Sequence, residues 1–534
     1  MSHFMKITVL DYGAGNVRSL INAVEKMGGS IKMVKKPEDI LAAERLIFPG
    51  VGNYGAMLEI LHDRGFVAPL REYLKADRPF LGICVGMQAL FEGSEEELIS
   101  TNESIGFFKG RVKRFRTELS VPHIGWNGIH IKQDSPFLDG VDPDTKFYFV
   151  HSYHIAPENP DVILTTTTYD YPFASAVQQG NVIGTQFHPE KSGTAGLKLL
   201  DNFIHSDSLN ARGPADIPAK GLSKRVIACL DVRSNDNGDL VVTKGDQYDV
   251  REAGSVRNLG KPVALARKYY EQGADEITFL NITGFRDFPL EDMPMLKVLE
   301  QTSKQVFVPL TIGGGIREFT DAQDRHYSSL DVAARYFRAG ADKVSIGSDA
   351  VYIAMAYLES GQKTKKSAIE EISRVYGAQA VVISVDPQRA WVTSPEDAPK
   401  HHVVKVTSGE KGPNGEAYCW YQCTVSGGRK AMDIDAVALA RTCEELGAGE
   451  ILLNCIDKDG TNSGFDLDLI NAVRSNVTIP VIASSGAGCE AHFAQVFKYT
   501  KAEAALAAGI FHREEVPIQS VKQHLAEQGI EVRK

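Results

Sequence analysis

Cys84 and His188 are the residues of this sequence best suited to covalent catalysis. Cys84 stands in GICVG at 82–86, and small residues on both sides of a cysteine allow a sharp turn that exposes sulfur at a helix N-terminus. His188 belongs to QFHPE at 186–190, where Glu190 can orient an imidazole that activates the thiol. A cysteine alone is more often a small buried hydrophobe, but the two segments together predict a nucleophile with its base.

Asp231 and Asp386 form a second candidate pair. Each ends an apolar segment, and two carboxylates can serve as general acid and general base on the two sides of a substrate. Either aspartate alone is equally well explained as a turn cap. Glycine- and serine-rich segments follow four other apolar runs, and backbone N–H groups exposed there predict a substrate with a phosphate at each end. The candidate phosphate-binding residues are Gly314, Gly315, Gly347, Ser348, Ser485, Gly486, Gly488, Ala508 and Gly509.

The elements that must position Cys84 and His188 lie between residues 4 and 206. Short apolar runs recur there between helix-like stretches such as NVRSLINAVEKMG, which predicts a mixed α/β sheet flanked by helices, with loops following the strands. Residues 207–224 are rich in Gly, Pro, Ser and Ala and show no apolar periodicity, so we expect a linker there.

Residues 225–534 contain an internal repeat. RVIACLDVR is echoed by AVVISVDPQR, GADEITFLNI by GAGEILLNCID, VPLTIGGG by IPVIASSGAG, and GADKVSIGSDA by AEAALAAGIF. Four strands per half with intervening helices predict a (β/α)₈ TIM barrel made from a duplicated half-barrel. Active sites of this fold lie at the C-terminal ends of the strands, where Asp231 and Asp386 would face each other from strands 1 and 5.

Charged residues begin several of the expected barrel strands. Glu276, Lys343 and Glu450 open strands 2, 4 and 6. Ala504 stands at the equivalent position of strand 8, and Arg225 starts strand 1. Because alternate strands contribute one layer of side chains, these charges should meet at the end of the barrel away from the active site. Buried charges are costly unless they pair, so the plainest interpretation is a structural plug of salt bridges.

Composition restricts the remaining possibilities. The 534 residues carry 58 Lys and Arg against 68 Asp and Glu, a net charge of −10, which does not favour nucleic acid or an anionic membrane as a partner. No apolar run approaches the roughly 20 residues that span a bilayer, and the start shows no secretory leader, so we expect a cytoplasmic protein. Seven scattered cysteines do not suggest a disulfide framework.

The segments around Cys84 and His188, and essentially the whole first domain, resemble the class I, triad-type glutamine amidotransferases. The resemblance implies that Cys84 attacks the side-chain amide of glutamine, that His188 passes a proton to the leaving ammonia, and that Glu190 orients His188. FPGVG at 48–52 matches the family's loop that directs N–H groups at the developing oxyanion. The oxyanion and glutamine-binding residues implied in this way are Gly50, Val51, Gly52, Val85, Gln88, His151, Ser152 and Tyr153.

The segments LDVR, VVTKGDQY, TIGGGI, SVDPQR, CIDKDGTNSG and ASSGAG resemble the cyclase barrel of the imidazole glycerol phosphate synthase family of histidine biosynthesis, over nearly all of 222–534. A glutaminase domain fused ahead of this barrel resembles the eukaryotic, bifunctional form. The implied reaction joins ammonia from glutamine to a bis-phosphorylated phosphoribulosyl formimino aminoimidazole carboxamide ribonucleotide, giving imidazole glycerol phosphate and aminoimidazole carboxamide ribonucleotide. No metal or other cofactor is implied, and both catalytic partners are already in one chain.

The same resemblance implies roles for residues of the barrel and of the interface. Asp231 and Asp386 become the cyclase acid and base, and Lys244 closes on the substrate. The residues implied to line the mouth are Asp459, Gly460 and Thr461, and those implied to form a gate for ammonia are Arg225, Glu276, Lys343 and Glu450. The residues implied to lie at the domain interface are Trp126, Tyr148, Lys191 and Asp342, with Lys191 near Asp342.

Three other functions remain open at this point. Another amidotransferase-coupled barrel, such as pyridoxal phosphate synthase, needs Schiff-base lysines at strand ends, where Asp231 and Asp386 stand here. A phosphoribosyl isomerase shares the half-barrel repeat but has no use for a glutaminase. A non-catalytic phosphosugar-binding scaffold does not need the combination of Cys84, His188 and Glu190.

Two features have no assigned role. Cys419 and Cys423, with His401 and His402 upstream, could suggest zinc, but the alternating apolar residues around them favour a hairpin strand. The segments 233–239, 321–331 and 388–430 are longer or more polar than a minimal barrel needs.

Overall fold

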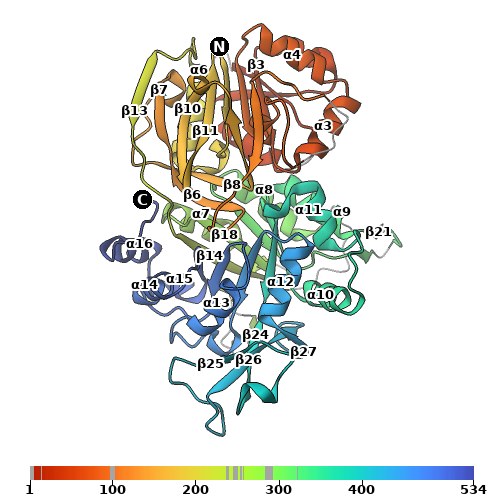
Figure 1. Ribbon diagram of the computed structural model, residues 1–534, viewed down its shortest axis with the longest axis vertical. Coiled ribbons are helices and arrows are strands. Elements are labelled where there is room, and N and C mark those ends of the chain that lie inside the picture. The colour runs from red at the N-terminus through yellow and green to blue at the C-terminus, as the bar shows by residue number, and fades with distance from the viewer. Residues whose placement is uncertain are drawn as a thin grey trace.

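The computed structural model describes residues 5–13, 15–96, 103–235, 240–243, 251–252, 255–256, 258–282, 293–321 and 323–534. Lys244 and much of the segment 233–239 lie outside these ranges. Figure 1 shows two parts, one above the other, with the N-terminal sheet at the top and the barrel below. No helix in the described ranges has the length and apolar character needed to cross a bilayer.

The N-terminal part contains an 11-stranded mixed sheet. Strands β2, β1, β3, β4 and β12 are parallel neighbours and lead their C-terminal ends to one edge, while β11, β10, β7 and β13 continue the sheet in antiparallel order. The strands are β1 (Met5–Val9), β2 (Gly29–Met33), β3 (Arg45–Gly50), β4 (Phe80–Cys84), β5 (Gly110–Arg114), β7 (His130–Asp134), β9 (Tyr153–Pro157), β10 (Ile163–Tyr169), β11 (Tyr171–Gln179), β12 (Val182–Thr185) and β13 (Gly213–Ile217). A separate pair, β6 (His123–Gly128) and β8 (Lys146–His151), lies toward the barrel (Figure 1).

Helices flank this sheet, and local sequence explains where two of them begin. The Asn16 side chain accepts a hydrogen bond from Ser19 N at 3.0 Å, and the Asn53 side chain accepts one from Ala56 N at 3.0 Å, so each asparagine caps a helix. The helices are α1 (Val17–Lys26), α2 (Pro37–Leu41), α3 (Tyr54–Asp63), α4 (Val67–Lys75), α5 (Val85–Gln88) and α6 (Gly193–His205).

The expected linker is partly ordered as a strand. Within 207–224, β13 adds to the edge of the sheet through antiparallel pairing with β7. An edge strand of this kind is held by backbone hydrogen bonds and needs no apolar periodicity, which is why the sequence pattern did not indicate it.

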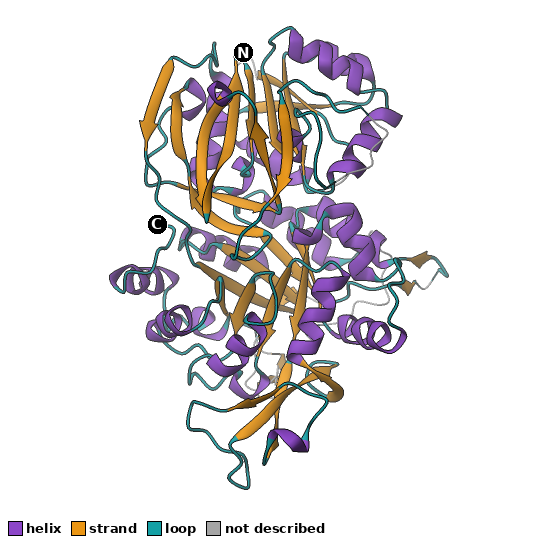
Figure 2. Cartoon of the chain, in the orientation of Figure 1, coloured by secondary structure: helices purple, strands orange, loops and turns teal. Residues whose placement is uncertain are grey.

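The predicted (β/α)₈ barrel is confirmed. Its eight strands are parallel neighbours in sequence order, and the first pairs with the last to close the ring. The strands are β14 (Arg225–Ser234), β18 (Glu276–Asn281), β19 (Leu310–Gly313), β22 (Lys343–Ile346), β23 (Val381–Val385), β28 (Glu450–Asn454), β29 (Val481–Ser484) and β30 (Ala504–Ala507). Helices surround them (Figure 2): α7 (Pro262–Glu271), α8 (Pro294–Ser303), α9 (Ser329–Ala339), α10 (Ser348–Ser360), α11 (Ala368–Tyr376), α12 (Ala436–Leu446), α13 (Leu467–Arg474), α14 (Glu490–Tyr499), α15 (Gly509–His512) and α16 (Ile518–Glu527).

The segment 388–430 belongs to a four-stranded antiparallel sheet at the end of the barrel away from the N-terminal part (Figure 1). Its strands are β24 (Pro387–Val392), β25 (Val403–Lys405), β26 (Tyr418–Val425) and β27 (Lys430–Asp435). Cys419 and Cys423 lie in β26, as the alternating pattern predicted. Three short pairings complete the barrel part, with strands β15 (Leu240–Val242), β16 (Arg251–Glu252), β17 (Ser255–Val256), β20 (Phe319–Thr320) and β21 (His326–Tyr327).

Candidate functional site

Cys84 occupies a strained turn between β4 and α5. Its backbone has φ 55° and ψ −110°, a conformation that side-chain-bearing residues seldom adopt. The glycines around it are required by space: a Cβ on Gly86 would lie 1.9 Å from Phe48 O, and one on Gly82 would lie 2.7 Å from Gly86 O. The turn therefore presents the thiol at the start of α5, in the position of a nucleophile.

His188 and Glu190 meet this thiol from the loop after β12. His188 Nδ1 lies 2.8 Å from Glu190 Oε1, and both side chains are buried. Burial opposes a charge on His188, but the Glu190 carboxylate and the Cys84 sulfur outweigh it and raise the pKa of His188 to about 10. A histidine that holds a proton beside the Cys84 sulfur can pass that proton on, so the three groups can act as a nucleophile with its proton carrier.

Gln186, for which the sequence predicted no separate role, also contacts the thiol. Its Nε2 lies 3.4 Å from Cys84 Sγ, and its Oε1 accepts a hydrogen bond from Gln88 Nε2 at 3.1 Å. Gln88 donates a second bond to Tyr153 O, also at 3.1 Å. Two buried amides thus link the thiol to the backbone of β9, and the sequence signal was the place of Gln186 in the QFHPE segment itself.

His151 is directed away from this arrangement. In β8 it shares a face with Phe147 and Phe149, while Tyr148 and Val150 face the domain interface. The His151 ring contacts Tyr153 O at 2.7 Å through Nδ1, and burial lowers its pKa to about 3. The structure therefore places His151 in an aromatic cluster under the site, as a neutral support for its backbone.

The proposed oxyanion loop lies directly beside Cys84. Gly50 ends β3 in register with Cys84, and a Cβ on Gly50 would lie 2.8 Å from Gly86 N. Val51 O accepts a hydrogen bond from Tyr12 OH at 2.8 Å, and Gly52 has φ 140°. The chain 50–52 therefore runs beside the residues that hold the thiol.

Asp231 and Asp386 occupy opposite sides of the barrel mouth. β14 and β23 are separated by three strands in either direction around the ring. Asp386 directly follows β23, and Asp231 lies toward the C-terminal end of β14, opposite Leu280 of β18. Asn454 Nδ2 donates to Asp386 Oδ1 at 2.7 Å, and the Thr424 hydroxyl donates to Asp386 O at 2.7 Å. Asp386 is therefore fixed both by a neighbouring barrel strand and by β26 of the added sheet.

The glycine-rich segments gather into two groups at this mouth. Gly314 and Gly315 follow β19, and Gly347 and Ser348 follow the adjacent β22. The second group, on the opposite side of the ring, follows the adjacent strands β29 and β30 and comprises Ser485, Gly486, Gly488, Ala508 and Gly509. Two separated anion sites suit a substrate with two phosphates.

The charged layer forms a closed ring at the other end of the barrel. Arg225 lies 2.7 Å from Glu276 and 2.6 Å from Glu450, and Lys343 lies 2.7 Å from each of the same two carboxylates. All four side chains are at most 1% exposed. Two cations and two anions alternate, so every buried charge has two partners of opposite sign.

A small cavity separates this ring from the Cys84 site. Lys191 Nζ lies 2.6 Å from Asp342, which precedes Lys343, and Asn16 Nδ2 donates to Asp342 at 2.9 Å. Trp126 Nε1 donates to Asp275 O at 3.1 Å. The cavity is lined by Gly15, Asn16, Val51, Tyr148, Val150, His188, Glu190 and Lys191 of the first part and by Phe337, Asp342, Lys343, Tyr376, Gln379 and Ala380 of the barrel.

Comparison with known proteins assigns both parts. Residues 8–206 match the family "Glutamine amidotransferase class-I", and residues 225–517 match "Histidine biosynthesis protein". The chain is 59% identical to the chloroplastic imidazole glycerol phosphate synthase hisHF of Arabidopsis thaliana, over 99% of this chain and 89% of that one. It is 54% identical to the hisHF protein of Schizosaccharomyces pombe, over 99% and 100%.

Separate barrel subunits are also similar. Imidazole glycerol phosphate synthase subunit HisF of Methanosphaera stadtmanae is 42% identical over 312 residues, which are 58% of this chain and 99% of that subunit. The chain described here therefore belongs to the bifunctional imidazole glycerol phosphate synthases of histidine biosynthesis, which join a glutamine amidotransferase domain and a cyclase barrel in one polypeptide.

Proposed function

We propose that the two sites act in sequence on one nitrogen atom. Cys84 attacks the glutamine side-chain amide, His188 delivers a proton to the departing ammonia, and water then releases glutamate from the thioester. Ammonia crosses the cavity and the charged ring into the barrel. At the mouth, Asp231 and Asp386 act as acid and base while ammonia cleaves the bis-phosphorylated ribonucleotide and the imidazole ring closes.

The observation that carries this proposal is the small cavity that lies between the Cys84 site and the charged ring. His188 and Glu190 line one wall of the cavity, and Lys343 of the ring lines the other. At neutral pH free ammonia is mostly protonated and is then no nucleophile, so ammonia made in contact with bulk water would be largely wasted. A route that excludes water keeps it reactive.

The two glycine-rich groups support the choice of substrate. They lie on opposite sides of the mouth with the aspartates between them, as a molecule with a phosphate at each end would require. Asp459, Gly460 and Thr461, in the loop after β28, would complete the nucleotide site, together with Lys244.

We also propose the bounds of the domains, the partners of the enzyme and its location. The glutaminase domain spans 4–206, the linker 207–224 and the cyclase 225–534. The small-molecule partners are glutamine and the nucleotide, with no requirement for nucleic acid, a membrane, a metal or another cofactor. The enzyme works in the cytoplasm, which fractionation of cells expressing the tagged chain would test, since the similar Arabidopsis protein is named as chloroplastic.

Isotope competition tests the path directly. The enzyme is given the nucleotide substrate and glutamine labelled with nitrogen-15 at the side-chain amide, in a large excess of unlabelled ammonium at a pH where little ammonia is free. We expect the imidazole ring of the product to keep nearly all of the label. Dilution of the label to the isotope ratio of the bulk ammonium would refute the enclosed route.

A further inference from the structure

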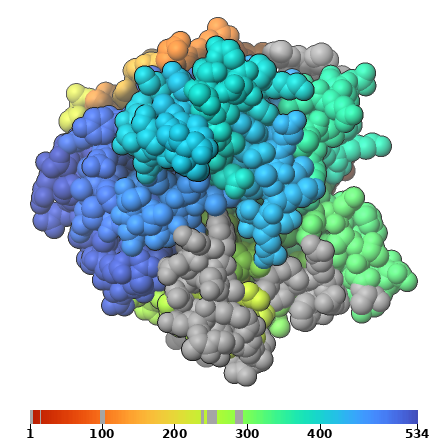
Figure 3. All heavy atoms as spheres, turned by 90° about the horizontal axis from the view of Figure 1, so that it is seen from below, coloured from red at the N-terminus to blue at the C-terminus, as the bar shows by residue number. Residues whose placement is uncertain are grey.

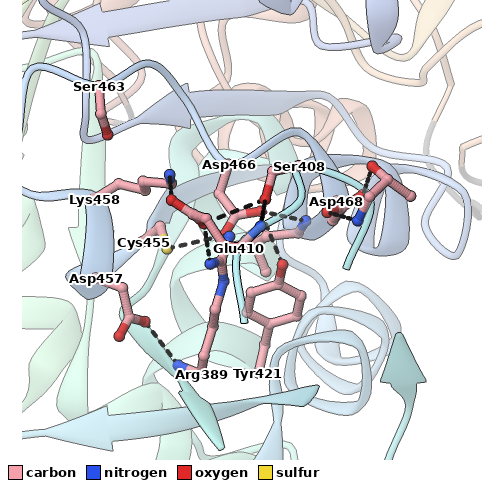
Figure 4. Close-up of polar contacts among 12 residues, drawn as sticks. Arg389, Ser408, Glu410, Tyr421, Cys455, Asp457, Lys458, Ser463, Asp466 and Asp468 are labelled. Atoms are coloured by element: carbon pink, nitrogen blue, oxygen red, sulfur yellow. Dashed lines mark hydrogen bonds and ion pairs between the residues drawn. The ribbon is translucent and has the colours of Figure 1, made fainter. Parts of the chain in front are cut away.

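Glu410, in the segment 406–417 between β25 and β26, joins the added sheet to the loop after barrel strand β28. Its carboxylate pairs with the Arg389 guanidinium, and its Oε1 lies 2.7 Å from Lys458 Nζ. Figure 4 shows Glu410 between these two side chains. Glu410 is 43% exposed, whereas Arg389 and Lys458 are only 4% and 9% exposed, so a carboxylate reaching in from the surface pairs with two buried cations.

Arg389 is anchored independently of Glu410. Its Nη2 and Nε lie 2.6 and 3.0 Å from Asp466 Oδ2, and its backbone N–H donates to Asp457 at 2.7 Å. Tyr421 OH holds the other oxygen of Asp466 at 2.8 Å. Loss of the Glu410 charge would therefore leave Arg389 paired and in place.

Lys458 has no such second anchor among the residues that the structure describes. In the part of the chain that the structure describes, Glu410 is the carboxylate that pairs with it. A buried ammonium without a counter-ion is costly, so a neutral side chain at 410 would drive Lys458 toward water. Burial raises the pKa of Glu410, but its bonds to Lys458 and Arg389 outweigh burial and lower that pKa to about 2. The Glu410 carboxylate is therefore charged at neutral pH, and we call its pairing with Lys458 the clamp.

The backbone of Lys458 lies where two substrate segments meet. Lys458 ends the short helix Ile456–Lys458, immediately before Asp459, and its carbonyl accepts the Thr461 hydroxyl at 2.9 Å. Its Cβ lies 3.2 Å from the position that a Cβ on Gly486 would take. A shift of Lys458 would thus move the β28 loop and loosen its contact with the second glycine-rich group.

We propose that Glu410 is a positioning residue for the cyclase reaction, which sets the affinity for the bis-phosphorylated nucleotide by holding Lys458 and the loop 459–461 against the mouth. The inference deepens the proposed function and rests on it. It also gives a role to the segment 388–430: on the end of the molecule shown in Figure 3, the cyan residues of this segment gather beside the blue residues that follow them in the chain. Glu410 contacts no reacting atom, so its effect falls on binding and not on the chemical step.

The test is steady-state cyclisation driven by ammonium salts, which removes the glutaminase from the measurement. For Glu410→Gln we expect KM for the nucleotide to rise about three- to thirtyfold, the range for residues that act on a site without touching its ligand, with kcat changed less than about twofold. Glu416→Gln is the matched control, because Glu416 lies in the same segment but bonds to Asn414 within it. This control should keep the KM of the unmodified enzyme.

Lys458→Met separates positioning from general destabilisation. If Glu410 acts through Lys458, Glu410→Gln should add little to the KM of Lys458→Met, whereas fully additive effects would overturn the proposal. An unchanged KM in folded Glu410→Gln would overturn it as well. Should that variant fail to fold, Glu410→Asp decides: an intermediate KM supports the clamp, and an unchanged one refutes it. Absence of ammonium-driven cyclisation in the unmodified enzyme would instead refute the proposed function.

Discussion

Removal of the Lys343 ammonium tests whether the charged ring is more than a structural plug. Lys343→Ala takes away the cation that lies 2.7 Å from both Glu276 and Glu450, and leaves Arg225 as the counter-ion in the ring. The net charge of the four side chains changes from zero to −1. The barrel wall of the cavity also loses the Lys343 side chain.

The magnitude follows from the burial of the ring. Breaking a buried pair by removing one partner costs about 3–5 kcal/mol, and here each carboxylate keeps one partner, so we expect the unfolding free energy to fall by an amount in the lower part of that range. Burial raises the pKa of Glu450, but Arg225 and Lys343 outweigh it and hold that pKa below its usual value. Such a lowered pKa stabilises the fold above the usual glutamate pKa, and this stabilisation is lost as pH falls through the lowered value. The difference in unfolding free energy between the unmodified protein and Lys343→Ala should therefore become smaller as the pH is lowered.

The functional readout is the ratio of glutamate to imidazole glycerol phosphate, measured in the same reaction. We expect Lys343→Ala to hydrolyse glutamine faster than it forms product, while synthesis from ammonium salts changes little because Asp231 and Asp386 are untouched. Lys366→Ala, on the exposed surface of the barrel part, is the control. A ratio that stays near one in a folded Lys343→Ala protein would refute the gate and leave the ring as a plug.

Four other substitutions separate the parts of the mechanism. Cys84→Ala should abolish glutamine-dependent synthesis and leave ammonium-dependent synthesis largely intact, and loss of both activities in a folded protein would contradict separate sites. Asp231→Asn and Asp386→Asn should each lower cyclisation by roughly 10²- to 10⁴-fold with glutamine hydrolysis retained, as expected for a general acid or base; near-normal cyclisation would remove that residue from the role. Arg533→Ala removes a guanidinium that lies 2.7 Å from Asp275 and 4.2 Å from the Trp126 ring, so we expect a glutamate-to-product ratio above one and would abandon a coupling role if it matched the unmodified enzyme.

The sequence predicted those features that are repeated or local. The barrel strands could be predicted because they are apolar segments that occur in two similar halves. The ring of charges could be predicted because Glu276, Lys343 and Glu450 start equivalent strands. The alternation of side chains along β8 also indicates that His151 faces away from Tyr148. The family resemblance alone, which implies one role for His151, Ser152 and Tyr153, does not indicate this. Periodicity therefore carries orientation as well as secondary structure.

Contacts between distant segments could not be predicted in this way. Asn16 meets Asp342 across 326 residues, and Glu410 meets Lys458 across 48. One partner of each pair, Asn16 or Glu410, lies outside every repeat and motif. The sequence did not predict β13 because an edge strand is held by backbone hydrogen bonds, which nearly any residue can form. The sequence of one chain shows the chemical character of each side chain, and the fold determines which other side chain it contacts.

Fusion of the two domains explains why their interface can be built from orienting contacts. A tether holds the partners at high effective concentration, so contacts across the interface need not supply the affinity of a free complex. Several of them are instead directional and lie next to the ring: Lys191 reaches Asp342 beside Lys343, and Trp126 reaches Asp275 beside Glu276. Movement of either domain would act on residues adjacent in sequence to the ring, which gives the glutaminase and the cyclase a short mechanical connection.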